Sequence, residues 1–469
     1  MTRVLVVSGD RVGQSMAGPA IRCWEMCRLL AANGHEVHLA TPAASDREPD
    51  RFELVTSSQQ TLYRESAWAD VLVVQGVVTA VYPFLLNSGK HLVVDLYDPY
   101  NLEILESFYD HPFEERMAQH RGHLGALMAQ LHRGDFFLCA SEKQRDYWLG
   151  MLSSAGRVNP NTHGRDRLLR SLINTASFGI SATPPKPGTE PVAKGVLPGI
   201  EADARLVVWG GGVYNWFDPL SLIRAWPAIL EREPRARLMF LGMKHPNPDV
   251  PEMEMALKAI RLAEDMGLRD RAIHFNTTWV PYDERQNYLC EADIGVSTHF
   301  DHIETAFSFR TRILDYIWAG LPVVSTEGDE FARWIADRGT GRVVAFEDAV
   351  SIARAIGDLL TESGQYEQAS DAVRRCQPEY RWERTLRPLV AYCDNPEPAA
   401  DLAASPPSAA EIEAMAELAG SALAPRGTAA RARYFIRTEG MRRLARRALR
   451  SGRRKLVRAL AEPKALDGP

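Results

Sequence analysis

The chain has 469 residues, of which 45% are hydrophobic and 25% charged, and its net charge is −5. This length exceeds what a single hydrophobic core usually serves, so we expect two domains plus appendages. The charge balance excludes the basic excess of a nucleic-acid-binding protein, and no apolar run is long enough to span a bilayer. The six cysteines are dispersed without metal-ligand spacing, and the start lacks a signal peptide, which favours a cytosolic protein with reduced thiols and no metal site.

Short apolar runs in the first part of the chain predict buried strands. They lie at residues 3–8, 36–40, 70–74, 91–95 and 135–140. Segments with helical periodicity separate several of them, at 19–33 and 113–132. Strand–helix alternation of this kind indicates a parallel sheet covered by helices on both faces. A stretch rich in Pro and Gly at 175–200 then interrupts the pattern and is typical of an interdomain linker.

A second alternating series follows this linker. Its predicted strands are 205–209, 237–241, 272–275, 293–297 and 322–325, and its predicted helices are 219–232, 252–266, 282–292 and 308–319. The fold class is therefore α/β, with two successive doubly wound, Rossmann-like domains. We expect the first domain to comprise residues 1–185 and the second 196–378.

The C-terminal part reads as three segments. A helix at 379–393 closes the folded part, and residues 394–410 form a Pro/Ala linker that we expect to be flexible. Residues 411–469 are an acidic and then basic helical tail, in which 426–458 carry thirteen Lys/Arg and one acid, a balance of 13 − 1 = +12. A basic amphipathic helix can lie on an anionic membrane surface, and its apolar stripe favours lipid over nucleic acid. A solvated extension remains the alternative.

Glycine-rich loops follow the first strand of each series. In open α/β sheets ligands bind at the carboxyl ends of the strands. Gly18 precedes Pro19 at a helix start, where a ligand could approach free amides, although a plain turn is the alternative. Gly210, Gly211 and Gly212 would let backbone amides meet a phosphate without an intervening Cβ. Neither loop has GxGxxG spacing or the Lys-Ser/Thr of a P-loop, which argues against nicotinamide binding and against an ATPase.

A charged segment precedes the last strand of the second series. If a helix begins near Ser308, its first-turn amides and Arg310 or Arg312 would face a pyrophosphate, which guanidinium groups bind through paired donors. Asp315, on the same helix face, suits ribose hydroxyls. The alternative is a surface ion pair between Arg312 and Asp315, worth about 0.2–0.5 kcal/mol. Lys244, after another strand, either adds charge to the same anion or is an ordinary solvated lysine.

These residues carry a resemblance to a known family. The segment Ser308-Phe309 … Asp315-Tyr-Ile-Trp-Ala-Gly320-Leu-Pro-Val-Val resembles the donor-site motif of family-4 glycosyltransferases of the GT-B fold. Residues 275–281, 292–297 and 33–37 are similar to further motifs of that family, and the resemblance spans roughly residues 1–393. It implies Ser308 and Phe309 as donor-binding residues.

The chain also departs from that motif. The first acid of the motif falls on Phe307, so that Glu304 is the nearby carboxylate that could take its role. The family's glycine is Arg310 here, and residues 214–218 replace the usual Arg and Lys after the glycine-rich loop. Arg310, Arg312 and Lys244 are therefore expected to provide the positive charge.

The resemblance implies transfer of a sugar from a nucleoside-diphosphate sugar with retention at the anomeric carbon, and without cofactor or metal. Catalysis would rest on leaving-group stabilisation by Arg310 and backbone amides. Asp98 lies where the family often has a His-Asp pair that faces the sugar and the acceptor, although a helix-capping aspartate is the alternative. Glu304 and His299 would contact the donor sugar, and His299 could equally be structural.

The acceptor class stays open between an envelope or lipid-linked glycan and another glycan or small molecule. With the basic tail, the expected location is the cytoplasm, with peripheral contact at the inner face of the plasma membrane. Two alternative functions remain. The substitution at Phe307 motivates a non-catalytic nucleotide-sugar-binding protein, and a GT-B sugar-nucleotide epimerase would need no acceptor.

Overall fold

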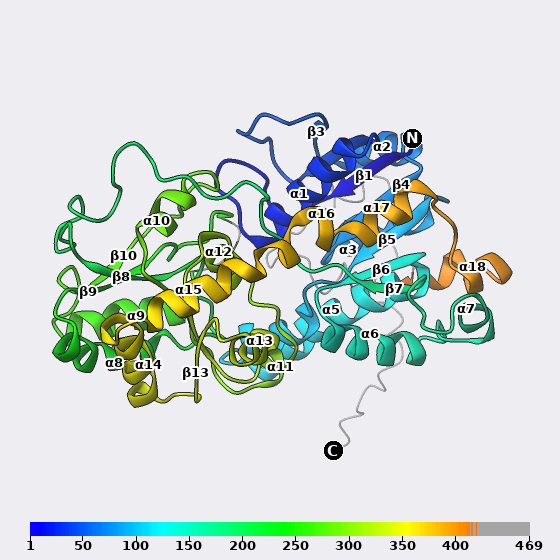
Figure 1. The fold of residues 1–469 in the computed structure, drawn as a ribbon. Coiled ribbons are helices and arrows are strands. Elements are labelled where there is room, and N and C mark those ends of the chain that lie inside the picture. The colour runs from blue at the N-terminus through cyan, green and yellow to red at the C-terminus, as the bar shows by residue number, and fades with distance from the viewer. Residues whose placement is uncertain (249, 251, 413, 416–418, 420–469) are drawn as a thin grey trace, which may run out of the picture.

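The computed structural model describes residues 1–248, 250, 252–412, 414–415 and 419. The predicted basic tail, including 426–458, lies outside the described residues. Figure 1 shows two units side by side, each built on one sheet with helices on both faces. We name them the N-terminal unit and the C-terminal unit after the order of their sheets along the chain.

The N-terminal unit contains a sheet of seven strands. These are β1 (Arg3–Val7), β2 (Glu36–Thr41), β3 (Glu53–Thr56), β4 (Val71–Gln75), β5 (His91–Asp95), β6 (Phe136–Cys139) and β7 (Ile173–Thr175). Their order is β3-β2-β1-β4-β5-β6-β7, and every pairing is parallel. In the register, Val4 pairs with Val37 on one side and Val71 on the other. The strand runs are apolar on both faces because helices cover both sides of the sheet.

The C-terminal unit contains a sheet of six strands. These are β8 (Arg205–Trp209), β9 (Ala236–Phe240), β10 (Ile273–Phe275), β11 (Ile294–Ser297), β12 (Val323–Thr326) and β13 (Gly341–Val344). The order is β10-β9-β8-β11-β12-β13, again entirely parallel. In both sheets the order in which successive strands are added therefore reverses beside the first strand. This position is the topological switch point, where doubly wound folds bind ligands.

Helices connect the strands in both units. In the N-terminal unit they are α1 (Gly18–Ala32), α2 (Gln59–Trp68), α3 (Val78–Val81), the 3₁₀ turn η1 (Pro83–Asn87), α4 (Tyr100–Ser107), α5 (Phe113–Arg133), α6 (Glu142–Ser154) and α7 (Pro160–Arg165). In the C-terminal unit they are α8 (Pro219–Arg232), α9 (Glu254–Asp265), α10 (Arg285–Glu291), α11 (Ile303–Phe307), α12 (Arg312–Ala319), α13 (Glu330–Arg338), α14 (Ala349–Thr361) and α15 (Gln365–Cys376). The α/β fold class with two Rossmann-like units is confirmed.

The predicted helix at 308–319 is wrong at its start. Two helices, α11 and α12, occupy the region, and the chain between them is not helical. Ser308 has an extended backbone conformation and its hydroxyl donates to the carbonyl of Thr305, which stops the helical ladder. Helix α12 then begins at Arg312 and ends at Gly320, whose φ of 72° lies in the left-handed region typical of a helix C-terminus.

The expected single helix at 379–393 is also wrong, because the chain forms three short pieces. They are the 3₁₀ turn η2 (Gln377–Tyr380), α16 (Trp382–Thr385) and α17 (Arg387–Asp394). The chain crosses back to the N-terminal unit here (Figure 1). The amide of Ile180 donates to the carbonyl of Tyr380 at 2.7 Å, and the amide of Trp382 donates to the carbonyl of Ile180 at 3.1 Å.

The segment expected to be a flexible linker instead packs against the N-terminal unit. It contains α18 (Ala400–Ala404), which lies beside α7. Asp401 forms a buried ion pair with Arg157, at 2.5 Å between Nε and Oδ2. The apolar and proline-rich composition predicted flexibility. Because a buried charge needs a partner, the pair of Asp401 with Arg157 helps to hold the segment against the N-terminal unit.

A cavity between the two units

A cavity of about 280 Å³ lies between the two units, at the carboxyl ends of the strands. Of the predicted site residues, eight line this cavity: Gly18, Asp98, Gly211, Gly212, Phe309, Arg310, Arg312 and Asp315. Residues from both units therefore meet at the switch points beside the first strands, where doubly wound folds bind ligands. These eight residues come from four separate segments of the sequence, and the structure brings them to one site.

The glycine-rich loop after β8 is fixed to helix α12 by Tyr316. The hydroxyl of Tyr316 accepts a hydrogen bond from the amide of Gly210 at 2.8 Å and lies 2.8 Å from the carbonyl of Val296, to which it donates. Its ring fills the space next to Gly295, where a Cβ would come within 2.2 Å of the ring. Gly211 has a φ of 69°, a conformation that favours glycine. The loop and the start of α12 are therefore held as one rigid edge of the cavity.

Arg312 is the first residue of α12 and turns its guanidinium toward this loop. Its Nη2 donates to the carbonyl of Gly212 at 2.9 Å, and the guanidinium carbon lies 4.4 Å and 4.1 Å from the ring centres of Trp209 and Phe217. The side chain is only 8% exposed, and its Nη1 has no hydrogen-bond partner among the described residues. Burial lowers the pKa of Arg312 to about 10, so it remains a cation at neutral pH. One donor of a buried guanidinium is thus free to meet an anion in the cavity.

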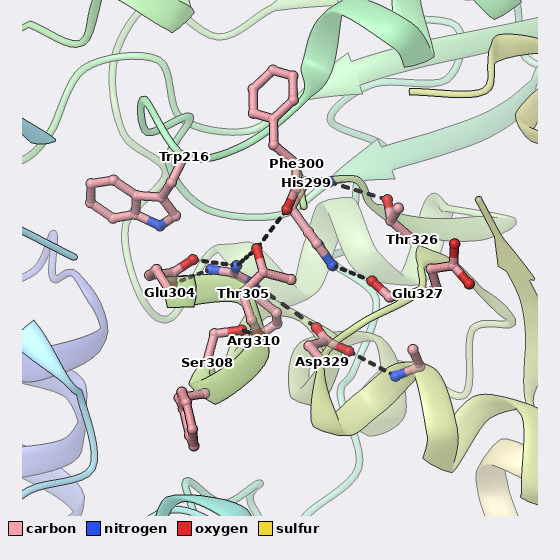
Figure 2. A network of polar contacts seen from close by, with 12 residues as sticks. Trp216, His299, Phe300, Glu304, Thr305, Ser308, Arg310, Thr326, Glu327 and Asp329 are labelled. Atoms are coloured by element: carbon pink, nitrogen blue, oxygen red, sulfur yellow. Dashed lines mark hydrogen bonds and ion pairs between the residues drawn. The ribbon is translucent and has the colours of Figure 1, made fainter. Parts of the chain in front are cut away.

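Arg310 forms a buried network with two carboxyl groups (Figure 2). Its Nη1 and Nη2 donate to the two oxygens of Glu304 at 2.8 Å and 2.7 Å, and Nη2 also reaches Thr305 Oγ1 at 3.2 Å. Its Nε lies 3.9 Å from Oδ2 of Asp329. Burial raises the pKa of Asp329 to about 6, while Arg310 pulls it down. The guanidinium of Arg310 reaches the cavity, but its strongest contacts are already made within the protein.

Glu304 does not lie on the cavity wall. It is 1% exposed, and both of its oxygens are engaged by Arg310. Phe307, which stands at the position of the motif's first acid, faces the N-terminal unit: its ring lies 4.9 Å from that of Tyr147, and its carbonyl accepts from Gln144 at 2.9 Å. The substitution has therefore replaced a carboxylate by a packing contact between the two units.

Asp315 is paired with an arginine that the sequence analysis missed. Arg285 Nε donates to Asp315 Oδ1 at 3.0 Å, and its guanidinium carbon lies 3.8 Å from the ring centre of Tyr282 and 4.8 Å from that of Trp318. The alternative pairing of Asp315 with Arg312 is wrong. The other oxygen of Asp315 accepts no hydrogen bond from the described residues, so the carboxylate can still accept from a ligand hydroxyl.

Three further predicted donor residues lie away from the cavity wall. Lys244 is a largely exposed side chain at 3.9 Å from Glu252, beside a smaller hollow. Ser308 uses its hydroxyl to end α11. His299 is fully buried, and its Nε2 lies 3.0 Å from the carbonyl of Glu327, so the structural reading of this histidine is the one that the contacts support (Figure 2). Burial, and then the charge of Arg310, hold the pKa of His299 well below its usual range.

The N-terminal unit contributes a pair of carboxyl groups. Asp98 follows β5, and Glu103 lies in the first turn of α4; both line the cavity and share a side-chain hydrogen bond. Burial raises the pKa of Asp98 to about 6, and burial followed by the charge of Asp98 raises the pKa of Glu103 well above its usual range. Helix α4 takes no side-chain cap, so the capping alternative for Asp98 is wrong.

Gly18 opens helix α1 at the same wall. A Cβ at this position would lie 3.7 Å from Thr311 Oγ1 of the C-terminal unit and 3.8 Å from the hydroxyl of Tyr97. The helix has no side-chain cap at Ala17, and Pro19 has no amide hydrogen to donate. Gly18 and Pro19 thus line a narrow part of the cavity at the start of α1.

Below this wall lies a fully buried ion pair. Arg22 of α1 donates from Nε and Nη2 to the two oxygens of Asp95 at 2.7 Å and 2.9 Å. It also donates to the carbonyl of Ala176 at 2.7 Å, and Gln75 donates to Asp95 at 3.0 Å. The guanidinium carbon lies 5.0 Å from the ring centre of Tyr97. This network supports the loop that carries Asp98, and it explains why Asp95 is not itself in the cavity.

Aromatic side chains form much of the remaining wall, and the sequence analysis did not single them out. Tyr214 and Trp216 stack at 4.9 Å between ring centres, and Trp279 donates to the carbonyl of Met16 at 3.1 Å across the two units. Tyr214 and Trp216 directly follow the glycine-rich loop, which was the available signal. Trp279 and Arg285 come from segments far from that loop, and only the fold places them here. No cluster of three or more metal-ligating side chains occurs in the described ranges.

Residues 203–362 match the family described as Glycosyl transferases group 1. Among curated proteins, the chain is similar to two D-inositol 3-phosphate glycosyltransferases. The one from Corynebacterium urealyticum is 26% identical over 206 residues, 44% of this chain and 46% of that protein. The one from Saccharomonospora viridis is 23% identical over 251 residues, 51% of this chain and 56% of that protein. The chain thus spans about half the length of the curated relatives it matches.

The solved structures cover more of the chain. Sucrose-phosphate synthase from Thermosynechococcus elongatus aligns over 84% of this chain and 99% of its own, with a TM-score of 0.61 and 16% identity. Anabaena HepE in complex with UDP and glucose aligns over 84% of this chain and 100% of its own, with a TM-score of 0.58 and 14% identity. These likenesses establish the fold. The chain therefore has the GT-B fold, and its residues 203–362 match the family described as Glycosyl transferases group 1.

Proposed function

We propose that the protein is a glycosyltransferase that takes a sugar from a nucleoside-diphosphate sugar and transfers it to an acceptor hydroxyl. The observation that carries this proposal is the buried guanidinium of Arg312, which keeps one free donor at the wall of a cavity between the two units. The glycine-rich loop beside it leaves room for a phosphate. The family match of residues 203–362 supports the same activity.

In the proposed reaction the acceptor oxygen bonds to the anomeric carbon, and the bond from that carbon to the diphosphate breaks. The electron pair leaves with the nucleoside diphosphate, and the hydroxyl proton passes to a diphosphate oxygen. Arg312 and Arg310 stabilise the developing negative charge, an electrostatic effect that is large in a buried site. Phe307 stands in place of an acid and Glu304 is held by Arg310, so we propose retention by front-side attack, without a protein nucleophile.

Asp315 is proposed to accept from the ribose hydroxyls of the donor through its free oxygen, while Arg285 holds its orientation. Asp98 is proposed to face the sugar and the acceptor. The amides at Gly211, Gly212 and the start of α1 at Gly18 would meet the diphosphate, and Phe309 packs beside them on Phe331 at 4.7 Å. Glu304 acts by fixing Arg310.

The experiment that tests this function is calorimetric titration of the full chain with UDP-, GDP- and dTDP-sugars, followed by assay of donor hydrolysis and transfer. We expect binding to one nucleotide and slow donor hydrolysis without acceptor. Absence of binding to every nucleotide sugar would contradict the proposal. The second candidate, a nucleotide-sugar-binding protein without transferase activity, is favoured by Phe307 in place of an acid, and it predicts binding without hydrolysis.

We further propose that the reaction takes place in the cytoplasm, at the inner face of the plasma membrane, with 426–458 as the membrane contact. The +12 balance of this segment supports contact with anionic lipid. No helix in the described part of the chain is long and apolar enough to cross a membrane. Deleting residues 424–469 should abolish sedimentation with anionic liposomes and leave donor affinity unchanged. Equal sedimentation of both proteins would remove the tail as the contact.

A further inference from the structure

The charged groups of the cavity are sorted between its two walls. The C-terminal unit contributes three guanidinium groups, those of Arg285, Arg310 and Arg312, and the carboxylate of Asp315. The N-terminal unit contributes two carboxyl groups, those of Asp98 and Glu103, and among the described residues no lysine, arginine or histidine from that unit lines the cavity. One wall is therefore suited to an anion and the opposite wall is not.

The two carboxyl groups of the N-terminal wall have no cation of their own. No ion pair joins either of them to a basic side chain in the described part of the chain. Arg310, whose charge acts on both, donates from Nη1 and Nη2 to Glu304. They are instead hydrogen-bonded to each other, which requires one proton between the two groups. Glu103 keeps this proton and donates it to Asp98.

That the cavity is built for a ligand follows from a separate residue. Arg312 lines the cavity and is 8% exposed, and its buried Nη1 has no hydrogen-bond partner among the described residues. A buried donor without a partner is costly unless a ligand satisfies it. The ligand at that end is anionic, so the molecule that lies against the opposite wall meets the carboxyl pair. A phosphate there would face two acids and no base.

We propose that the acceptor is a polyol or sugar that carries an amino group, and that its ammonium binds between Asp98 and Glu103. This inference rests on the proposed function, because it assigns the second substrate of the same cavity. On binding, the ammonium takes the place of the shared proton: Glu103 releases one proton to solvent, and both carboxylates then accept from the ammonium. A cation held by two desolvated carboxylates is bound more strongly than a neutral hydroxyl at the same place.

Other titratable groups surround the pair. They are Asp95, Tyr97 and Tyr100 of the N-terminal unit, and Tyr214, Glu304 and Arg310 of the C-terminal unit. Burial raises the pKa of each of these tyrosines, so they remain neutral near pH 7. Glu304 and Arg310 neutralise each other. The proton that leaves on binding is therefore that of the carboxyl pair.

The test is calorimetry of the full chain at about pH 6.5 with four hexoses of one scaffold: glucosamine, glucose, N-acetylglucosamine and glucose 6-phosphate. We expect glucosamine to bind at least about tenfold more tightly than glucose, as a charge-assisted contact allows. Acetylation of the amine should remove this gain, and the phosphate should give none. In buffers of different ionisation enthalpy, binding of glucosamine should release about one proton.

Variants make the test specific to the pair. Glu103→Gln should abolish proton release and reduce the preference for glucosamine, and Asp98→Asn should reduce the same preference. Glu106→Gln on the same helix, away from the cavity, should leave both unchanged. Equal or weaker binding of glucosamine relative to glucose, preferred binding of the phosphate, or an undiminished preference in Glu103→Gln would each overturn the inference. Nucleotide-sugar titrations of the same samples report separately on the proposed function.

Discussion

The two units share one strand order and differ in the charge that they present to the cavity. Each has a first strand, a glycine-containing loop and a helix at its switch point. The C-terminal unit places Arg310 and Arg312 at this edge, whereas the N-terminal unit places Asp98 and Glu103 there. The doubly wound fold thus fixes where ligand-binding loops meet, while a few side chains decide what those loops can bind.

Each wall is also supported by a buried ion pair. Arg22 with Asp95 lies within the N-terminal core, where the carbonyl of Ala176 accepts from Arg22 and Gln75 donates to Asp95. Arg310 with Glu304 lies next to the cavity and has a second carboxyl group, Asp329, within 3.9 Å. The pair of Arg22 and Asp95 therefore lies wholly within the core. In the other pair, Arg310 has Asp329 nearby as a second carboxyl partner.

The largest expected effect is the loss of protein stability when one of these pairs is broken. Removing one partner from a buried pair leaves an uncompensated charge, which costs about 3–5 kcal/mol. We expect Asp95→Ala to reach this range in the free energy of unfolding measured with urea. Glu304→Ala should cost less, since Arg310 can turn to Asp329.

A matched surface variant controls for the loss of a carboxylate alone. Asp337 pairs with Arg333 at 3.7 Å with both side chains largely exposed. Asp337→Ala should therefore cost less than about 1 kcal/mol. A greater loss in Glu304→Ala than in Asp95→Ala would contradict the difference between the two pairs.

The next effect is a pH dependence of stability to which Asp329 of the C-terminal unit contributes. The raised pKa of Asp98 acts in the same direction in the N-terminal unit. The pKa of Asp329 is raised to about 6 in the folded protein, above its unfolded value of 3.8. The folded state then holds a proton that the unfolded state has lost, so the free energy of unfolding falls as the pH rises from about 4 to 6. This difference in the pKa of Asp329 corresponds to at most about 3 kcal/mol in the free energy of unfolding.

Asp329→Asn should flatten this fall, because asparagine can still cap α13 at Ala332 and carries no charge. Urea denaturation at several pH values between about 4 and 7 measures it, with the wild-type chain alongside. If the variant and the wild type lose stability in parallel over this range, Asp329 is not the group responsible.

A smaller effect concerns donor binding. Arg312→Ala should weaken nucleotide-sugar affinity by roughly 1.5–3 kcal/mol, as for a hydrogen bond to a charged group. Arg312→Lys should recover only part of this, because lysine lacks the planar fork. Lys244→Ala, at an exposed position outside the cavity, should change the affinity little. Calorimetry with the preferred nucleotide sugar decides between the variants, and equal losses for Lys244→Ala and Arg312→Ala would place the anion elsewhere.

The smallest expected effect is that of chelation. With guanidinium groups as the cations of the C-terminal wall, transfer activity should be unchanged by EDTA. The measurement is turnover before and after chelation, with Mg²⁺ or Mn²⁺ added back. Loss of turnover that either ion restores would mean that the arginines do not suffice to neutralise the diphosphate.

Much of the fold could be predicted because its central strands are buried on both faces. The runs at 91–95 and 205–209 coincide with β5 and β8, because a short continuous apolar run is typical of a strand buried on both faces of a parallel sheet. Strand β3 was missed because Glu53–Thr56 lies at the sheet edge and is half exposed. The three-residue β7 was missed because its sequence runs into the linker.

The site divides in the same way. Arg312 and Asp315 could be placed from their motif, because loop, helix and bend are local features of the sequence. Their partners could not be, since Gly212 and Arg285 reach them only through the packing of the sheet. Glu103 carried no signal of its own: it becomes notable only because burial sets it against Asp98. Local pattern predicts which elements form, and tertiary contact decides which charges meet.

The return of the chain at Ile180, Tyr380 and Trp382 has a consequence for how the protein can be divided. The N-terminal unit is not one continuous stretch of sequence, because Thr2 donates to the carbonyl of Cys393 at 2.7 Å and Arg157 pairs with Asp401. A fragment that stops before these residues would leave Arg157 as a buried cation without its carboxylate. The C-terminal unit is in effect an insertion into the N-terminal unit, and its two connecting segments lie side by side at Ile180 and Arg381.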